Sequence, residues 1–322
     1  MKFTIALFVM LCATTLLLAQ SVEIGSPPGR LVNIGGRKIH MICTGSGSPT
    51  VVLEAGASSF AIDWALVQPE IARTNRVCSY DRAGMGWSDP ETGGPRGGVT
   101  VDLHTALEAA QEKPPYIMVG ASLGGIYVRL FADQYPAEVV GMVLVDPASE
   151  DRLFLFFEGK PVAIASLTAE QRRSIIPPGP MRVPRRSPQT GVPFDRLPRE
   201  LYELRIKLDT RLIASVPESV PYEVVVATAE QERASLAKLR ERRTAQAHPL
   251  GDRPLVVLTR GVDSNQEVRD VHARLAGLST NSRHTVVTDA GHEIHLFQPG
   301  AVIQAIRDVL EASRSKKKLP AR

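Results

Sequence analysis

The chain has 322 residues, of which 43% are hydrophobic and 22% are charged, and its formal net charge at pH 7 is +4. This composition is that of an ordinary globular protein, and it excludes a fibrous, low-complexity or wholly disordered chain. Part of the small positive charge lies in the C-terminal tail SRSKKKLPAR, and because no nucleic-acid-binding motif accompanies it we expect no nucleic-acid partner.

Residues 1–20 are predicted to be an export signal. Lys2 is followed by an apolar stretch from Phe3 to Ala19, and no further charge occurs before Glu23. The stretch is almost long enough to cross a bilayer, so an uncleaved membrane anchor is the alternative. With cleavage near Ala19 or Gln20 we expect a periplasmic or secreted protein that keeps no stable membrane span.

Beyond the signal, short strands alternate with helices. Residues 30–45 form two strand-like runs about the turn GGRK, which predicts a hairpin at the start of a sheet. Short apolar runs rich in valine then suit strands that are buried on both faces of a mostly parallel sheet, at 50–56, 76–81, 116–120, 141–146, 254–259 and 284–289. Helix-length segments lie between or after most of them, at 62–73, 101–111, 123–135, 267–278 and 300–314. This alternation predicts an α/β fold with a mostly parallel central sheet flanked by helices.

Residues 149–249 interrupt the alternation. They contain no good strand, include the proline-rich stretch 175–198, and carry helix-like segments near 198–213 and 228–247. A stretch of this length is too long for a connection between neighbouring strands, so we predict an inserted helical cap, with a flexible linker as the alternative. The core is then expected to comprise residues 21–148 and 250–322.

Two cysteines, Cys43 and Cys78, remain after removal of the signal, and both fall in predicted strands. They could pair in an oxidising compartment or stay as buried free thiols, and the sequence leaves both alternatives open. Neither has the spacing of a metal ligand, and we expect no metal and no organic cofactor.

The pentapeptide GASLG at 120–124 has the pattern GxSxG. It follows the apolar run YIMVG and precedes a helix-compatible stretch that ends near Pro136. A sharp turn between a strand and a helix exposes a serine and points helix N-terminal amides at an oxyanion formed beside it. The pentapeptide alone occurs by chance, but this context predicts that Ser122 is a nucleophile rather than an ordinary turn serine.

A serine nucleophile requires a base and a carboxylate that orients the base. We predict that His292, in the turn after the last strand, is the base, and that His295 is a bystander. Asp146 and Asp263 both give the order serine, acid, histidine. Asp146 is favoured because it closes its strand directly before Pro147, and Asp263 remains the alternative. The other histidines are expected to be structural: His40, His104, His248, His272 and His284.

Two backbone amides are expected to hold the oxyanion of the tetrahedral intermediate. One is the N–H of Leu123, directly after Ser122. The other is the N–H of Ala57, in the loop after VVLEAG, where Gly56 allows the chain to turn.

Together these segments resemble the α/β-hydrolase superfamily, specifically an esterase-like branch with a helical cap. The resemblance rests on the motifs VVLEAGASS, SYDRAGMGWSD, GASLGG, LVDP and DAGHEIH, and it covers about residues 29–148 and 250–314. It implies an α/β-hydrolase fold and a serine hydrolase that cleaves small-molecule carboxylic esters through an acyl-enzyme. Ser122 argues against the dehalogenase and epoxide-hydrolase members, which use an aspartate at that position.

Two positions depart from the superfamily pattern. Ala55 and Gly56 stand where a His-Gly pair is frequent, which leaves the backbone donor in place. Ser264 stands where an acid is usual, which further favours Asp146. The alternatives are an amidase or proline-type aminopeptidase and, from another class, a noncatalytic protein that binds a small apolar ligand.

The consecutive residues Asp81 and Arg82 match a common structural loop of the superfamily. They are predicted to form an ion pair with each other and to take no part in catalysis.

Overall fold

The structure is a computed structural model, and it describes residues 24–91, 98–150, 154–157, 160–163, 170, 181–182 and 185–320. The predicted export signal therefore lies outside the described residues. Among the residues that are described, no helix has the length and apolar character needed to cross a membrane.

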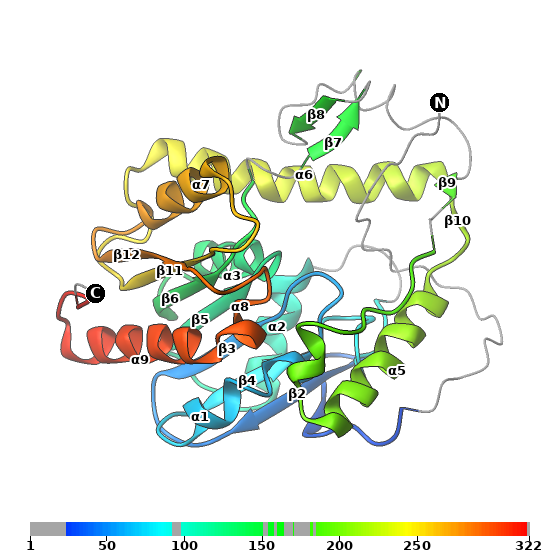
Figure 1. The fold of residues 1–322 in the computed structure, drawn as a ribbon, viewed down its shortest axis with the longest axis horizontal. Coiled ribbons are helices and arrows are strands. Elements are labelled where there is room, and N and C mark those ends of the chain that lie inside the picture. Colours follow the sequence, from blue (N-terminus) through cyan, green and yellow to red (C-terminus); the bar gives the residue numbers. More distant parts are fainter. Residues whose placement is uncertain are drawn as a thin grey trace.

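An eight-stranded sheet forms the centre of the molecule (Figure 1). Its strands are β1 Arg30–Asn33, β2 Lys38–Thr44, β3 Thr50–Glu54, β4 Val77–Tyr80, β5 Tyr116–Ala121, β6 Val139–Val145, β11 Leu255–Arg260 and β12 Ser282–Val287. They lie in the order β1-β2-β4-β3-β5-β6-β11-β12. The pairs β1–β2 and β2–β4 are antiparallel and the others are parallel. The predicted hairpin and mostly parallel sheet are confirmed.

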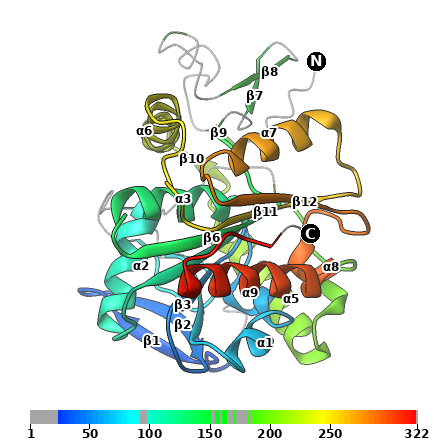
Figure 2. The ribbon, with the colours of Figure 1, turned by 90° about the vertical axis from the view of Figure 1, so that its left-hand side faces the viewer.

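Helices cover both faces of the sheet, so its central strands are buried on both sides (Figure 2). One face carries α2 Gly98–Ala109, α3 Gly124–Gln134 and α7 Gln266–Ala276. The other carries the 3-10 turn η1 Ala61–Trp64 and the helices α1 Gln68–Ala72, α8 Ile294–Phe297 and α9 Pro299–Ser315. Burial on two faces explains why the strands are continuous apolar runs without alternation.

The helix predicted at 62–73 is interrupted. The 3-10 turn η1 ends at Trp64, and α1 begins at Gln68 with Pro69 in its first turn. Proline has no N–H, and its ring clashes with the preceding helical turn, so a helix running continuously through Pro69 is unfavourable.

The segment predicted as a cap lies between β6 and β11. Its described helices are the 3-10 turn η3 Phe194–Arg196, α5 Arg199–Ser215 and α6 Tyr222–Ala245. The expectation that it contains no strand is wrong. Two short antiparallel pairs form outside the main sheet, β7 Phe154–Phe157 with β8 Lys160–Ala163 and β9 Met181–Arg182 with β10 Ser219–Val220. Strands of two to four residues are too short to show a periodic pattern.

Both long helices of this segment dock on the core. Leu208 of α5 packs against Phe60 beside η1, and Leu236 of α6 packs against Ile126 of α3. Arg205 of α5 is fully buried, and its guanidinium donates to the Asp63 carboxylate at 2.9 Å. The turn η1 follows β3 along the chain, and Ile126 follows β5. The helices α5 and α6, which pack there, therefore stand over the carboxyl ends of these strands.

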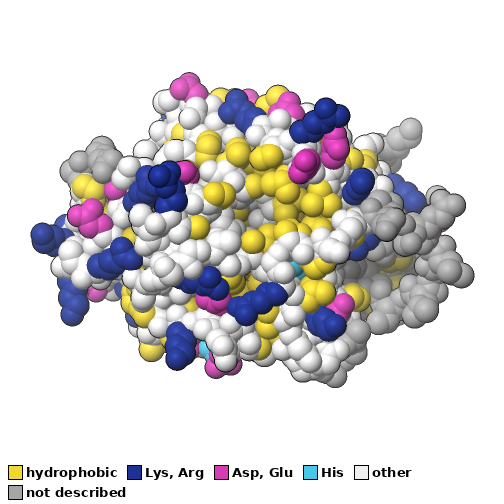
Figure 3. All heavy atoms as spheres, turned by 90° about the horizontal axis from the view of Figure 1, so that it is seen from below, with side chains coloured by type: hydrophobic (Ala, Val, Ile, Leu, Met, Phe, Trp, Pro, Cys, Tyr) yellow, Lys and Arg dark blue, Asp and Glu magenta, His cyan; other side chains and the backbone are white. Residues whose placement is uncertain are grey.

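The described surface also carries a hydrophobic area. Seen from below the view of Figure 1, hydrophobic side chains gather around a hollow, with charged side chains about them (Figure 3). Hollows with apolar walls are where proteins usually hold small molecules.

Candidate active site

The candidate site forms where β3 and β5 lie side by side. From β3 the chain continues to β4 on one side, and from β5 it continues to β6 on the other. The loops at the carboxyl ends of the two strands therefore diverge, and the crevice between them is the usual ligand site of an open α/β sheet. Ser122 follows β5, and Ala57 follows β3 beside it.

Ser122 occupies a sharp turn between β5 and α3. Its φ is +51°, in the left-handed region that residues other than glycine rarely adopt. The flanking glycines are required by space. A Cβ on Gly120 would lie 2.5 Å from the Gly124 carbonyl oxygen, and a Cβ on Gly124 would lie 2.5 Å from the Glu54 carbonyl oxygen. The turn therefore depends on both glycines, and it lifts the serine out of the sheet.

Hydrogen bonds connect Ser122, His292 and Asp146, which come from three separate loops. The Ser122 Oγ lies 2.9 Å from His292 Nε2, and His292 Nδ1 lies 2.5 Å from Asp146 Oδ2. With its proton on Nδ1, the imidazole donates to Asp146 and accepts the hydroxyl hydrogen of Ser122 at Nε2. The structure thus brings together the three residues predicted as nucleophile, base and acid, in an arrangement that can remove the serine proton.

Arg260, the last residue of β11, also holds Asp146. Its backbone N–H donates to Oδ1 at 3.0 Å and its guanidinium donates to Oδ2 at 2.6 Å. Burial alone would raise the pKa of Asp146, but the hydrogen bond and charge of His292, followed by the N–H and charge of Arg260, lower that pKa below its ordinary value. The sequence reasoning missed Arg260. The only sequence feature that pointed to Arg260 is its position as a charged residue at the end of a mostly apolar strand.

The alternative acid, Asp263, lies apart from this group. It is exposed in the loop after β11, and its carboxylate makes no hydrogen bond or ion pair with any residue that the structure describes. His295 is buried, with its ring centroid 4.7 Å from that of Trp64. Desolvation, together with the charges of His292 and Arg205, lowers the pKa of His295 to about 3, so it stays neutral.

The remaining histidines have structural partners. His104 bonds to Glu138 at 3.0 Å, and His248 bonds to the Gly277 carbonyl oxygen at 2.8 Å. His272 and His284 each lie 2.7 Å from the Thr259 hydroxyl.

The predicted ion pair between Asp81 and Arg82 is wrong. Asp81 pairs with His40 Nδ1 at 2.7 Å and accepts the Ala61 N–H at 2.7 Å, whereas Arg82 pairs with Glu54 at 2.5 Å. Successive side chains of an extended segment point to opposite sides, so these two neighbours reach different partners.

Arg82 fixes the loop after β3 from inside the core. Besides the Glu54 carboxylate, its buried guanidinium donates to the carbonyl oxygens of Ala55 at 2.7 Å and Gly56 at 2.6 Å. The carbonyl and N–H of one trans peptide point in opposite directions. Because the Gly56 carbonyl faces Arg82, the N–H of Ala57 points away from it.

The amides of Ala57 and Leu123 are available to a ligand. Both residues are partly exposed, and neither N–H bonds to another group among the described residues. Gly56 lies against the serine, since a Cβ there would be 3.3 Å from the Ser122 Cβ. Unpaired backbone donors next to a nucleophilic serine can stabilise the oxyanion that forms on the carbonyl oxygen under attack.

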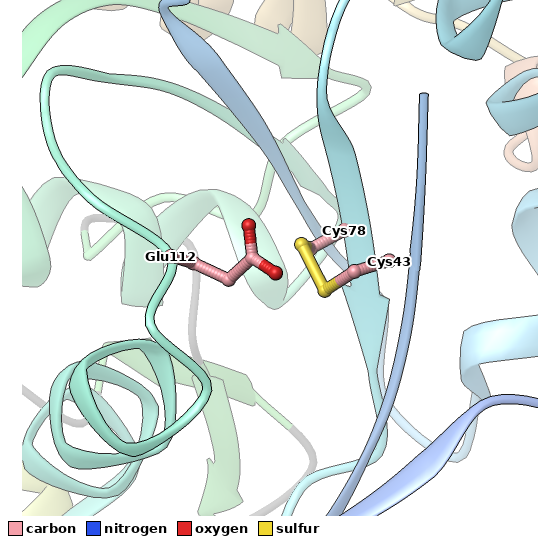
Figure 4. A group of neighbouring side chains, drawn as sticks. All are labelled: Cys43, Cys78 and Glu112. Carbon is pink, nitrogen blue, oxygen red and sulfur yellow. A yellow bond between two sulfur atoms is a disulfide. The ribbon is translucent and has the colours of Figure 1, made fainter. Parts of the chain in front are cut away.

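The group Cys43, Cys78 and Glu112 is the one set of clustered metal-ligand types found among the described residues (Figure 4). The two cysteines face each other on β2 and β4 and form a disulfide, so the free-thiol alternative is wrong. Glu112 accepts hydrogen bonds from Arg30 and Arg76 at 3.0 and 2.6 Å. Bonded sulfurs and an ion-paired carboxylate are poor ligands, so the chemistry of these donors does not fit a metal.

Comparisons with known proteins bear on the family and the fold of this chain. The Alpha/beta hydrolase family matches residues 47–305. The uncharacterized protein YqjL of Bacillus subtilis is 28% identical over 275 residues, which are 82% of this chain and 85% of that protein. An uncharacterized protein of Schizosaccharomyces pombe is 34% identical over 160 residues, 40% of this chain but only 30% of the relative. A solved thermophilic esterase from Thermogutta terrifontis shares the fold, with a TM-score of 0.56 and 21% identity over 86% of this chain and 94% of its own.

Proposed function

The chain belongs to the Alpha/beta hydrolase family, and from this premise we propose that it is a serine hydrolase that cleaves carboxylic esters of small molecules. The proposal rests on one observation, the hydrogen-bonded series from Ser122 Oγ through His292 to Asp146. The esterase with the same fold supports the choice of ester substrates.

In the first half-reaction, His292 Nε2 takes the hydroxyl proton while Ser122 Oγ bonds to the ester carbonyl carbon. The negative charge moves to the carbonyl oxygen, where the amides of Ala57 and Leu123 stabilise it. His292 then gives the proton to the leaving alkoxide, the carbon–oxygen bond breaks, and an acyl group remains on Ser122. Asp146 stays ionised throughout and stabilises the imidazolium.

In the second half-reaction, water takes the place of the alcohol. His292 removes a proton from the water as its oxygen attacks the acyl carbon, and the same two amides hold the oxyanion. The proton returns to Ser122 Oγ as the acyl bond breaks, which releases the carboxylic acid and restores the enzyme.

Hydrolysis of a p-nitrophenyl ester series, from acetate to palmitate, tests the proposal. Ser122→Ala or His292→Gln is expected to lower kcat about a thousandfold or more, because each residue acts in both half-reactions. Asp146→Asn is expected to reduce kcat strongly and Asp263→Asn to leave it nearly unchanged. The reverse order would make Asp263 the acid.

Labelling with a fluorophosphonate separates the other outcomes. A folded protein that neither turns over the esters nor reacts with the reagent at Ser122 would contradict the proposal and indicate a binding protein. Labelling without ester turnover would point to an amide or another acyl substrate.

We also propose that the protein is exported. The apolar stretch behind Lys2 supports a cleaved signal, and the disulfide between Cys43 and Cys78 suits an oxidising compartment. Intact mass and a thiol count of the protein recovered from periplasm or medium test this. A chain that begins near Ser21 carries no free thiol, whereas an uncleaved chain retains Cys12.

A further inference from the structure

The contact between Arg260 and Asp146 continues the parallel sheet into the candidate site. The Asp146 N–H donates to the Leu258 carbonyl oxygen at 2.8 Å, as in a regular ladder between β6 and β11. In such a ladder the N–H of Arg260 would donate to the Asp146 carbonyl oxygen. Asp146 instead leaves the strand with a φ of +43°, and the N–H donates to its side-chain Oδ1 at 3.0 Å. The sheet therefore fixes one oxygen of the carboxylate.

The other oxygen, Oδ2, is shared by two donors. The Arg260 guanidinium approaches it at 2.6 Å and His292 Nδ1 at 2.5 Å. These two nitrogens lie 3.1 Å from each other. A guanidinium cannot accept a hydrogen bond and stays charged at all relevant pH values. A permanent positive charge therefore stands next to the imidazole that is proposed as the base.

We propose that Arg260 is a positioning residue, which fixes the Asp146 carboxylate and favours the neutral form of His292. The inference rests on the proposed function, because it concerns the base of that reaction. A carboxylate beside an imidazole favours the protonated ring, and a cation beside the ring opposes this. Only the neutral ring can take the proton of Ser122. Arg260 thereby extends the pH range of the base toward acid.

Other groups around Asp146 and His292 do not supply this charge. His272 of α7 lies 3.9 Å from Asp146 Oδ1, with Nε2 2.9 Å from the Pro147 carbonyl oxygen and Nδ1 2.7 Å from the Thr259 hydroxyl. With a proton on Nε2 alone, the neutral ring satisfies both contacts.

The remaining titratable neighbours come from α8 and from the loop of His292 itself. His295 of α8 is neutral because burial lowers its pKa to about 3. Asp289 and Glu293 lie in the same loop as His292 and make no hydrogen bond or ion pair with it. Among the described residues, Arg260 is thus the cation that bonds to this pair.

The test compares Arg260→Met, Arg260→Lys and the native protein, with Arg274→Met, an exposed arginine of α7, as the matched control. Two quantities are measured, the acid limb of the pH profile of kcat/KM and the NMR titration of the His292 ring, assigned with His292→Gln. We expect Arg260→Met to move both midpoints about one pH unit higher, because the opposing charge is lost while the backbone N–H to Asp146 remains. Arg260→Lys is expected to move them less, and Arg274→Met not at all.

The two readouts separate failure of the inference from failure of the proposed function. If folded Arg260→Met keeps the native midpoints in both measurements, Arg260 is only structural and the inference is wrong. If the native protein hydrolyses no ester but the ring titration moves in Arg260→Met, the role of Arg260 stands and the proposed reaction falls. A lower kcat with unmoved midpoints would indicate a packing defect and would also overturn the inference.

Discussion

Ser122 and Asp146 both have a positive φ, +51° and +43°. Such a conformation costs a residue other than glycine on the order of 1–3 kcal/mol and persists only where its surroundings enforce it. Here the neighbouring strand supplies the constraint. The Ser122 N–H donates to the Val145 carbonyl oxygen at 3.0 Å, and the Asp146 N–H donates to the Leu258 carbonyl oxygen at 2.8 Å. Each strained turn is thus held by the next strand of the sheet.

Arg82 is expected to affect turnover through the loop that it holds. In Arg82→Lys the charge beside Glu54 remains, but one ammonium cannot serve the carboxylate and the carbonyls of Ala55 and Gly56 together. We expect kcat to fall roughly 10- to 100-fold with KM changed little, because the misplaced amide acts on the oxyanion. Steady-state kinetics with p-nitrophenyl acetate measure both constants.

Arg76→Lys is the matched control for Arg82. Arg76 also serves a carboxylate, Glu112 at 2.9 Å, and a carbonyl, that of Gly45 at 3.1 Å, but it lies at the amino end of β4, away from Ser122. We expect a loss of stability without an equal loss of kcat. Equal falls of kcat in both variants would mean that Arg82 acts through stability alone.

The positions of Ser122, Asp146 and His292 could be predicted because each lies in a short motif in the loop after a readable strand, directly after β5 and β6 for the first two and a few residues beyond β12 for His292. The partners of Arg82 and Arg260 could not. Arg82 bonds to Glu54, 28 residues away, and Arg260 bonds to Asp146, 114 residues away. Which side chains meet across neighbouring strands depends on strand order and register, and neither is visible in a local pattern.

Among the elements, the central strands were readable because burial on both faces leaves only apolar residues in them. The helix α6 begins at Tyr222, six residues before its predicted start. The run Val224–Val226 explains the difference, since three β-branched residues lower helix propensity. Pro221, directly before the first turn, nevertheless suits a helix start. The three valines are nevertheless part of α6, so their low helix propensity does not decide where the helix begins.

The docking of α5 is expected to depend on Arg205. In Arg205→Met the Asp63 carboxylate stays buried without its partner, which typically costs about 3–5 kcal/mol of unfolding free energy. In the native protein burial raises the pKa of Asp63 to about 6 although Arg205 opposes it, so the carboxylate there is charged at pH 7.5, and the variant loses the cation that offsets its burial. Urea unfolding at pH 7.5 measures the loss. The control Arg199→Met removes an exposed pair with Glu203 on the same helix and is expected to change little. Similar effects of the two substitutions would refute a special role for the buried pair.

At the scale of the molecule, the sheet and the segment between β6 and β11 have different roles in the proposed reaction. The core holds Ser122, His292 and Asp146, whereas α5 and α6 stand over the strand ends near them (Figure 1). In the proposed reaction, the residues that select the acyl chain and the alcohol are expected on this segment, which carries none of the motifs shared with the superfamily. This is why the sequence predicts a reaction type but not a substrate.

Acid stability of the whole protein is expected to depend on His295. Its pKa is about 3 in the folded state because of burial, against an ordinary 6.5. Between these values the unfolded chain binds a proton that the folded chain excludes, so the free energy of unfolding falls as the pH decreases from 6.5 toward 3. Asp63 acts in the opposite sense. Its folded pKa of about 6 exceeds the ordinary 3.8, so its contribution to stability grows as the pH falls through that range and partly offsets the loss.

His295→Leu removes only the histidine contribution to this pH dependence. We expect the variant to match the native protein at pH 7.5 within about 1 kcal/mol and to gain roughly 2.7 kcal/mol on it by pH 4.5, since a leucine has no proton to exclude. Urea unfolding of both proteins at the two pH values measures the difference, and the contribution of Asp63 cancels in the comparison. A difference between variant and native that is the same at pH 7.5 and 4.5 would show that His295 matters for packing and not for protonation.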